Sequence, residues 1–154
     1  MPILKFAHIA LMFLAFALGW ATDLLFYQAA RRGDLPGLVT IARYGRRLIP
    51  VGIGLFFAGL GVGLLNVFVG RFNPLAPWLL LAYGLVLVMM VLGIFVETPI
   101  FERMARRAEE EADAASPSPE LRAMLTDNRP LVLLFVSAAL WIAVIYVMVA
   151  KPLT

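Results

Sequence analysis

The stretch WLLLAYGLVLVMMVLGIFV, residues 78–96, decides the fold. It carries no charge, and as a helix it is long enough to cross the hydrocarbon core of a bilayer, which takes roughly 20 residues. Three further apolar runs of similar length cover about residues 3–27, 48–69 and 131–150. Hydrocarbon cannot satisfy an exposed backbone, and no barrel-like alternation is visible, so each run is expected to be helical. The sequence therefore predicts an all-α fold, a four-helix transmembrane bundle formed by the single domain 1–154.

The composition agrees with a membrane protein and excludes several kinds of site. Hydrophobic residues make up 62% of the chain and charged residues 15%, whereas soluble domains are about half apolar and about a quarter charged. The chain has no cysteine, which excludes disulfides, thiol catalysis and cysteine-ligated metal sites. The net charge of +3 is small and the basic residues are clustered, which indicates membrane topology and no nucleic-acid partner.

Two loops, about residues 28–47 and 97–130, hold most of the lysines and arginines. Loops rich in these residues stay on the cytoplasmic side of a membrane, whereas acidic residues have little influence on orientation. Both loops are therefore expected in the cytoplasm, and both termini on the outer, periplasmic side of a bacterial cytoplasmic (inner) membrane. The lipid bilayer is the first partner that this pattern predicts.

Both loops are expected to contain helical segments. The first, GDLPGLVTIARYGRRL, has the pattern of an amphipathic helix at the membrane surface. In the second, the segment beginning ERMARR predicts an extension of the third span, and SPSPE then breaks it, with Ser118 capping a short helix that begins at Pro119. Three prolines are expected at or near helix starts, where a missing N–H costs little: Pro50, Pro77 and Pro130.

The second span is rich in glycine, with Gly52, Gly59 and Gly63 among its members. Small residues let membrane helices approach closely, because packing and not water exclusion drives their association. Two interpretations are open. The glycines could form a face for a homodimer or a membrane protein partner, or they could pack inside the bundle of one chain.

Polar residues near the periplasmic helix ends form one candidate site. Lys5, His8 and Met12 lie three and four residues apart, so they share one face of the first helix. Tyr146 and Lys151 lie at the same level at the end of the last helix. Together these five residues predict a polar pocket that could bind a cofactor.

Two acids form a second candidate site near the cytoplasmic helix ends. Asp23 in the first span and Glu97 after the third approach the level of Arg46 and Arg47. Ionisable groups within spans are costly, so they are paired or functional. Structural ion pairs with the two arginines are the first expectation, and a proton pathway is the alternative.

His8 is the only histidine, and three roles are open for it. A neutral imidazole can ligate haem iron, it can transfer protons, or it can be a hydrogen-bonded polar residue near a helix end. One histidine without cysteine cannot build a conventional zinc site.

KFAHIA at the start, the long arginine-flanked loop and IYVMVAKP at the end resemble the bacterial four-helix membrane proteins grouped as domain of unknown function family 2269. More distantly, Lys5, His8, Ile9, Lys151 and Pro152 resemble the pattern of HemJ-type protoporphyrinogen oxidases, which are associated with haem b. This second resemblance implies His8 as the haem-iron ligand, with the two lysines holding propionates. A Pro-Arg element of that pattern is absent, and Gln28 stands near the place of its second histidine.

Three functions therefore remain open at the level of sequence. The first is a non-catalytic scaffold or accessory subunit. The second is a haem- or porphyrin-binding redox protein that uses His8. The third is a small-solute or proton transporter in which Asp23 or Glu97 faces a water-filled path.

Overall fold

The computed structural model describes residues 2–114 and 116–152, and these form helices joined by short connections. The helical elements follow one another as α1 (Pro2–Arg32), α2 (Leu35–Val69), α3 (Pro77–Leu92), the π-helix η1 (Gly93–Glu97), α4 (Thr98–Glu110), α5 (Pro119–Thr126) and α6 (Arg129–Ala150). Within these described residues, four helical stretches are long and apolar enough to cross a membrane. The predicted all-α, four-helix transmembrane architecture is thus confirmed, and the chain is a polytopic membrane protein.

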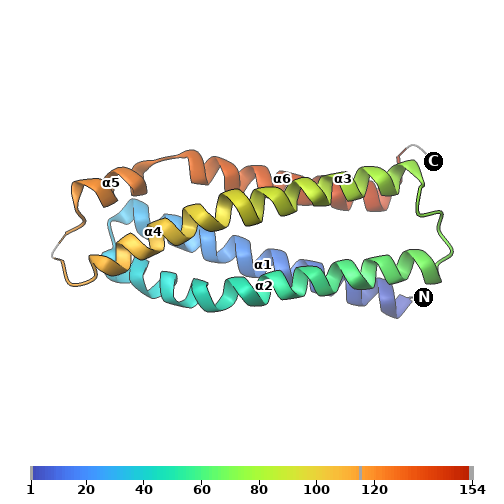
Figure 1. Ribbon diagram of the computed structural model, residues 1–154, viewed down its shortest axis with the longest axis horizontal. Coiled ribbons are helices and arrows are strands. Elements are labelled where there is room, and N and C mark those ends of the chain that lie inside the picture. The colour runs from blue at the N-terminus through green and yellow to red at the C-terminus, as the bar shows by residue number, and fades with distance from the viewer. Residues whose placement is uncertain (1, 115, 153–154) are drawn as a thin grey trace.

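The helices run along one long axis and form two antiparallel pairs (Figure 1). α1 packs along α2, and α3 packs along α6. α3, η1 and α4 continue into one another as a single rod, and α5 lies at the end where α4 stops. The N-terminus and the C-terminus lie together at the opposite end of the bundle (Figure 1).

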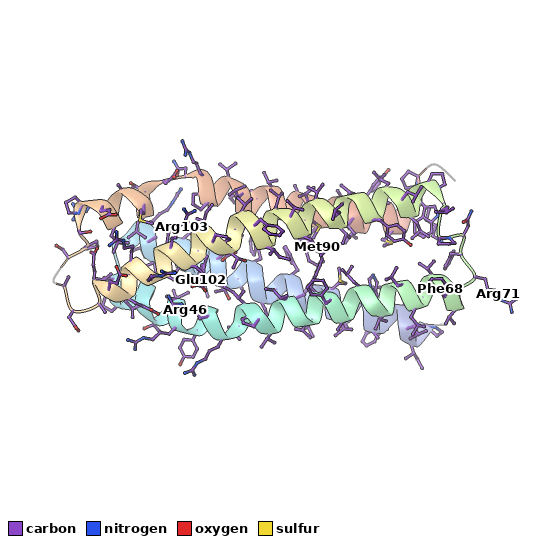
Figure 2. All side chains as sticks on the ribbon, in the orientation of Figure 1. Arg46, Phe68, Arg71, Met90, Glu102 and Arg103 are labelled. Atoms are coloured by element: carbon purple, nitrogen blue, oxygen red, sulfur yellow. The ribbon has the colours of Figure 1, made fainter. Side chains whose placement is uncertain are left out.

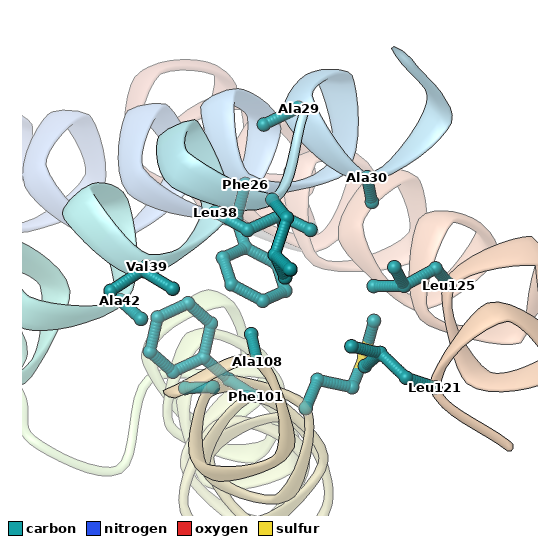
Figure 3. Close-up of a cluster of buried hydrophobic side chains, with 13 residues drawn as sticks. Phe26, Ala29, Ala30, Leu38, Val39, Ala42, Phe101, Ala108, Leu121 and Leu125 are labelled. Carbon is teal, nitrogen blue, oxygen red and sulfur yellow. The ribbon is translucent and has the colours of Figure 1, made fainter. Parts of the chain in front are cut away.

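Two hydrophobic cores join the helix pairs, one near each end. The larger core lies at the α5 end, and Figure 3 shows Phe26 of α1, Leu38 of α2, Phe101 of α4 and Leu121 of α5 meeting there. The smaller core lies at the end that holds the termini and contains Val67, Trp78, Leu79, Ala82 and Val147. The middle of the bundle lies between the two, and its outward faces are apolar, as expected for contact with lipid.

The predicted loops are shorter and more helical than the hydropathy suggested. Most of the segment 28–47 belongs to α1 and α2, and α2 runs without a break through Pro50. The expectation that Pro50 stands at a helix start is therefore wrong, because the amphipathic segment and the second span form one helix. Neighbouring helices let membrane helices tolerate such a proline.

The turns and caps follow from local sequence. Gly33, with φ +66°, makes the tight turn between α1 and α2, and the Asp34 Oδ1 then accepts a hydrogen bond from the Gly37 N–H at 3.0 Å to cap α2. Ser118 caps α5 through its hydroxyl, 3.1 Å from the Leu121 nitrogen, and Pro119 begins that helix as predicted. Pro77 and Pro130 stand in the first turns of α3 and α6, also as predicted.

Candidate functional site

A cavity of about 190 Å³ lies between the two helix pairs, in the middle of the bundle between the two cores. All four membrane-crossing stretches line it, through segments that include Ala15–Asp23, Ile49–Phe57, Met89–Phe101 and Leu134–Trp141. Met90, labelled in Figure 2, belongs to its wall on α3. Most lining residues are aliphatic or aromatic, and the lining contains no lysine, arginine or histidine.

Asp23 and Glu97 both line this cavity. They also share the wall of a second, much smaller cavity with Tyr27 and Pro130. Sequence analysis placed the two acids at one level of the membrane, and the structure brings them to one site. Two carboxyl groups in an apolar lining without a basic residue are costly to ionise unless a cation lies beside them, because the low dielectric of the interior penalises an uncompensated charge.

The π-helical turn positions Glu97. Pro99 has no N–H, so the carbonyl of Phe95 lacks its usual partner four residues on. Just before this proline the backbone hydrogen bonds change from an α-helical to a π-helical spacing, because the Thr98 N–H donates to the carbonyl of Gly93, five residues back. The Thr98 hydroxyl donates to the same oxygen at 2.8 Å. Such single-turn π-helices occur frequently at functional sites.

Ser137 on the neighbouring helix α6 orients the Glu97 side chain, because its hydroxyl hydrogen-bonds to the carboxylate Oε1. Sequence analysis did not single out Ser137 or Thr98. The sequence does contain a weak indication of Ser137, because it is the lone serine in the otherwise apolar run 131–150. A hydroxyl inside a span needs a partner, and here that partner is Glu97.

Arg46, one of the two arginines expected to neutralise these acids, is engaged elsewhere. Arg46 Nε lies 3.3 Å from Glu102 Oε2, and Arg46 Nη1 lies 2.7 Å from Glu109 Oε2. Figure 2 shows Arg46 on α2 and Glu102 on α4 side by side. Arg47 is exposed. Among the residues that the structure describes, Asp23 and Glu97 make no ion pair, so the predicted pairing with Arg46 is corrected: the α4 extension supplies closer acids.

The aromatic part of the lining forms a connected cluster. The ring of Phe16 packs on Trp141 with centroids 5.2 Å apart and on Trp20 at 6.0 Å, and Phe56 meets Trp141 edge to face at 6.0 Å. The Nε1 of Trp20 is buried and has no hydrogen-bond partner among the described residues. A buried donor without an acceptor is rare in folded proteins.

Asp23 and Glu97 lie at the end of the cavity that is nearer to α5. At about 1.5 Å per residue, Asp23 is roughly 30 Å along α1 from Ile3, and Glu97 is a similar distance along its rod from Trp78. That distance is about the thickness of the hydrocarbon core. The other end of the lining contains Met89 and Phe57. These two residues are only roughly half as far from the end of the bundle where the termini lie. The cavity thus reaches from the α5-side edge of the hydrocarbon toward its middle.

His8 packs between α1 and α2. Its Nδ1 lies 2.7 Å from the carbonyl oxygen of Gly59, and since a carbonyl only accepts, Nδ1 donates. The ring lies against Gly63, where a Cβ would come within 2.8 Å of the ring carbon Cε1. In the structure His8 is a hydrogen-bonded polar residue near a helix end, which is one of the three roles that the sequence left open.

The other residues of the predicted cofactor site have separate surroundings. Met12 is buried against Gly59, and Lys5 is exposed. Lys151 Nζ lies over the Phe72 ring at 4.9 Å and the Trp78 ring at 5.4 Å from the centroids. The Tyr146 side chain is 64% exposed and faces outward.

None of these five residues lines either cavity described above. The two lysines that the haem resemblance implies therefore share neither of these cavities with His8.

The three glycines of the second span face α1 within the same chain. A Cβ at Gly59 would meet Met12 Sδ at 2.7 Å, one at Gly63 would meet the His8 ring, and one at Gly52 would lie 3.7 Å from the Ala15 carbonyl oxygen. This is the packing inside the bundle that one of the two interpretations predicted. Gly54 and Gly61 lie on the outward face, and a Cβ there would meet nothing within 4 Å.

No family model, curated protein or solved structure matches the chain. The resemblance to the domain of unknown function family 2269 and to HemJ-type oxidases stays a prediction.

Proposed function

We propose that this protein binds a small cation in the cavity that Asp23 and Glu97 line, as a non-catalytic multi-pass protein of a bacterial inner membrane. One observation carries the proposal: two carboxylates line an apolar cavity between four membrane-crossing stretches, and no basic residue lines it with them. Ionisable groups at membrane depth are expensive and are kept for ion or substrate binding. A cation is the ligand that such a pair attracts.

A scaffold or accessory subunit, the first function expected from the sequence, needs no such cavity. The way in which the acids are held favours ligand binding over that role. Glu97 is oriented by Ser137 and carried on a π-helical turn, whereas Arg46, which was expected to pair with the acids, is committed to Glu102 and Glu109. Acids that served stability alone would gain most by taking that arginine as their partner.

The ligand reaches this cavity from the cytoplasm in our proposal. The end of the bundle nearest the acids carries the arginine-rich segments around α4 and α5, and the positive-inside rule assigns such segments to the cytoplasm. Both termini then lie on the periplasmic side. Cysteine accessibility tests this orientation: a cysteine at position 106 should be labelled from the cytoplasmic side only.

The binding proposal is tested by the effect of cations on thermal stability. A ligand that binds only the folded state raises the unfolding temperature with its concentration. Protein in mild detergent is heated in sodium, potassium, ammonium and methylammonium chloride at one ionic strength. At least one cation should stabilise the wild type and fail to stabilise an Asp23→Asn, Glu97→Gln double variant. If all the salts act equally on both proteins, the cavity binds no cation.

The matched control is a Glu110→Gln, Glu120→Gln double variant. It removes the same charge from exposed acids that pair with Arg107, so its response to the salts should equal that of the wild type.

A further inference from the structure

We infer that the cation is an amphiphilic primary ammonium compound, with its ammonium group between Asp23 and Glu97 and an apolar body among the aromatic side chains of the cavity. This inference rests on the proposed function, since it names the class of cation that the same site binds. Four features of the lining carry it.

The first feature is the shortage of oxygen ligands. Calcium takes six to eight oxygen ligands and magnesium demands a near-octahedral set. Among the described residues, no group of three or more histidine, cysteine, aspartate or glutamate side chains is placed to hold a metal ion. Asp23 and Glu97 line the cavity with few other polar side chains beside them, so a bare inorganic ion would lose its water without adequate replacement.

The second feature is the aromatic cluster. Phe16, Trp20, Phe56, Phe57 and Trp141 all line the cavity, and the contacts among Phe16, Trp20, Phe56 and Trp141 make them one continuous surface. Such a surface accepts the apolar body of a ligand, and aromatic faces also attract organic cations. A strongly hydrated inorganic ion gains little from it.

The third feature is a carboxylate without a partner. Asp23 lines the cavity and makes no ion pair among the described residues. A primary ammonium offers three N–H donors, and its bonds to carboxylates are charge-assisted and strong. A quaternary ammonium offers none, so the unpartnered carboxylate favours the primary amine.

The fourth feature is size. Pockets for drug-sized ligands measure roughly 300–1,000 Å³, whereas this cavity measures about 190 Å³. The ligand is therefore a small amine with one ring or a short branched chain. Phenethylammonium is a suitable probe of this class.

The test measures binding by titration calorimetry in mild detergent with four probes. Phenethylammonium has charge, N–H donors and an apolar body. 2-Phenylethanol keeps the body without the charge, methylammonium keeps the charge without the body, and benzyltrimethylammonium keeps charge and body without N–H donors. We expect phenethylammonium to bind one site per chain, at least about tenfold more tightly than each other probe, a difference of about 1.4 kcal/mol.

The outcomes separate this inference from the proposed function. If methylammonium binds as tightly as phenethylammonium, the cation site stands and the apolar body is wrong. If benzyltrimethylammonium binds as tightly, the cavity recognises only the charge and the aromatic body of a ligand, and the inference of a primary amine is wrong. If 2-phenylethanol binds as tightly, or if no cation binds, the proposed function fails as well. Asp23→Asn with Glu97→Gln should abolish phenethylammonium binding, while Glu110→Gln with Glu120→Gln should not.

Discussion

The Ser137 hydroxyl on α6 hydrogen-bonds to the Glu97 carboxylate on the π-helical turn, and this contact joins α6 to the rod formed by α3, η1 and α4 at the wall of the acidic cavity. Ser137→Ala removes the donor and leaves the carboxylate without its partner. We expect a loss of about 1–2 kcal/mol in the free energy of unfolding, together with weaker cation binding. Thermal unfolding in mild detergent measures the first effect and calorimetry the second.

Ser116→Ala is the control for this substitution. Ser116 is exposed in the connection between α4 and α5, so neither stability nor binding should change measurably. Equal behaviour of the two variants would show that Ser137 does not support Glu97.

Gly63→Ala should destabilise the protein by about 1–3 kcal/mol, the usual cost of overpacking. The added methyl group would stand 2.8 Å from the His8 ring carbon, and the hydrogen bond from His8 to Gly59 prevents the ring from moving away. Gly61→Ala, two residues earlier in the same helix, meets nothing within 4 Å and should be neutral or stabilising. Thermal unfolding of the two variants compares them directly, and an equal loss in both would contradict the packing described for α1 and α2.

His8→Ala should lower the unfolding temperature, because it removes the hydrogen bond to the Gly59 carbonyl and the contact with Gly63. Since the implied haem residues share no cavity, protein purified from haem-replete cells should show no stoichiometric Soret band, before or after dithionite. An absorbance spectrum from 350 to 650 nm tests this. A Soret band that disappears in His8→Ala would instead make His8 an axial ligand, as the HemJ-type resemblance implies.

Glu111 should make the connection to α5 sensitive to acid. Its Oε1 accepts from the Ser118 hydroxyl at 2.6 Å and its Oε2 from the Ser118 N–H at 2.7 Å, and these hydrogen bonds hold the pKa of Glu111 below its usual 4.5. A lowered pKa contributes stability that is present above the unfolded value and is lost as the pH falls through the folded value.

Glu111→Gln should therefore cost most near neutral pH, and its difference from the wild type should shrink as the pH falls below about 4.5. The carboxyl carbon of Glu111, followed by NMR, should titrate at a higher pH in Ser118→Ala than in the wild type. If the two titrations coincide, the Ser118 contacts do not set this pKa.

The membrane spans and the helix caps could be predicted from the sequence, because both depend on residues that are neighbours in the chain. The four spans follow from unbroken apolar runs, and the start of α5 follows from Ser118 and Pro119. The prediction that Pro50 stands at a helix start was wrong, because a proline at the start of one helix and a proline inside a longer helix can have the same local sequence. Only the continuation of α2 back to Leu35 distinguishes them.

The acids of the cavity could be found from the sequence, but their surroundings could not. Asp23 and Glu97 stood out as charges beside apolar runs. Whether they met Arg46 depended on the rotation of each helix and on how far α4 extends, because the extension brings Glu102 and Glu109 to that arginine. The partner of Glu97, Ser137, is distant in sequence, and its side chain gives no periodic signal.

The central claim is that Asp23 and Glu97 bind a cation inside the membrane region, and protection from a carbodiimide tests it most directly. Dicyclohexylcarbodiimide partitions into membranes and modifies carboxyl groups in apolar surroundings, and mass spectrometry locates the adducts. We predict modification at Asp23 or Glu97, reduced by methylammonium or phenethylammonium chloride and unaffected by 2-phenylethanol. Modification confined to exposed acids such as Glu110 and Glu120, or modification of Asp23 and Glu97 that no cation reduces, would contradict the account.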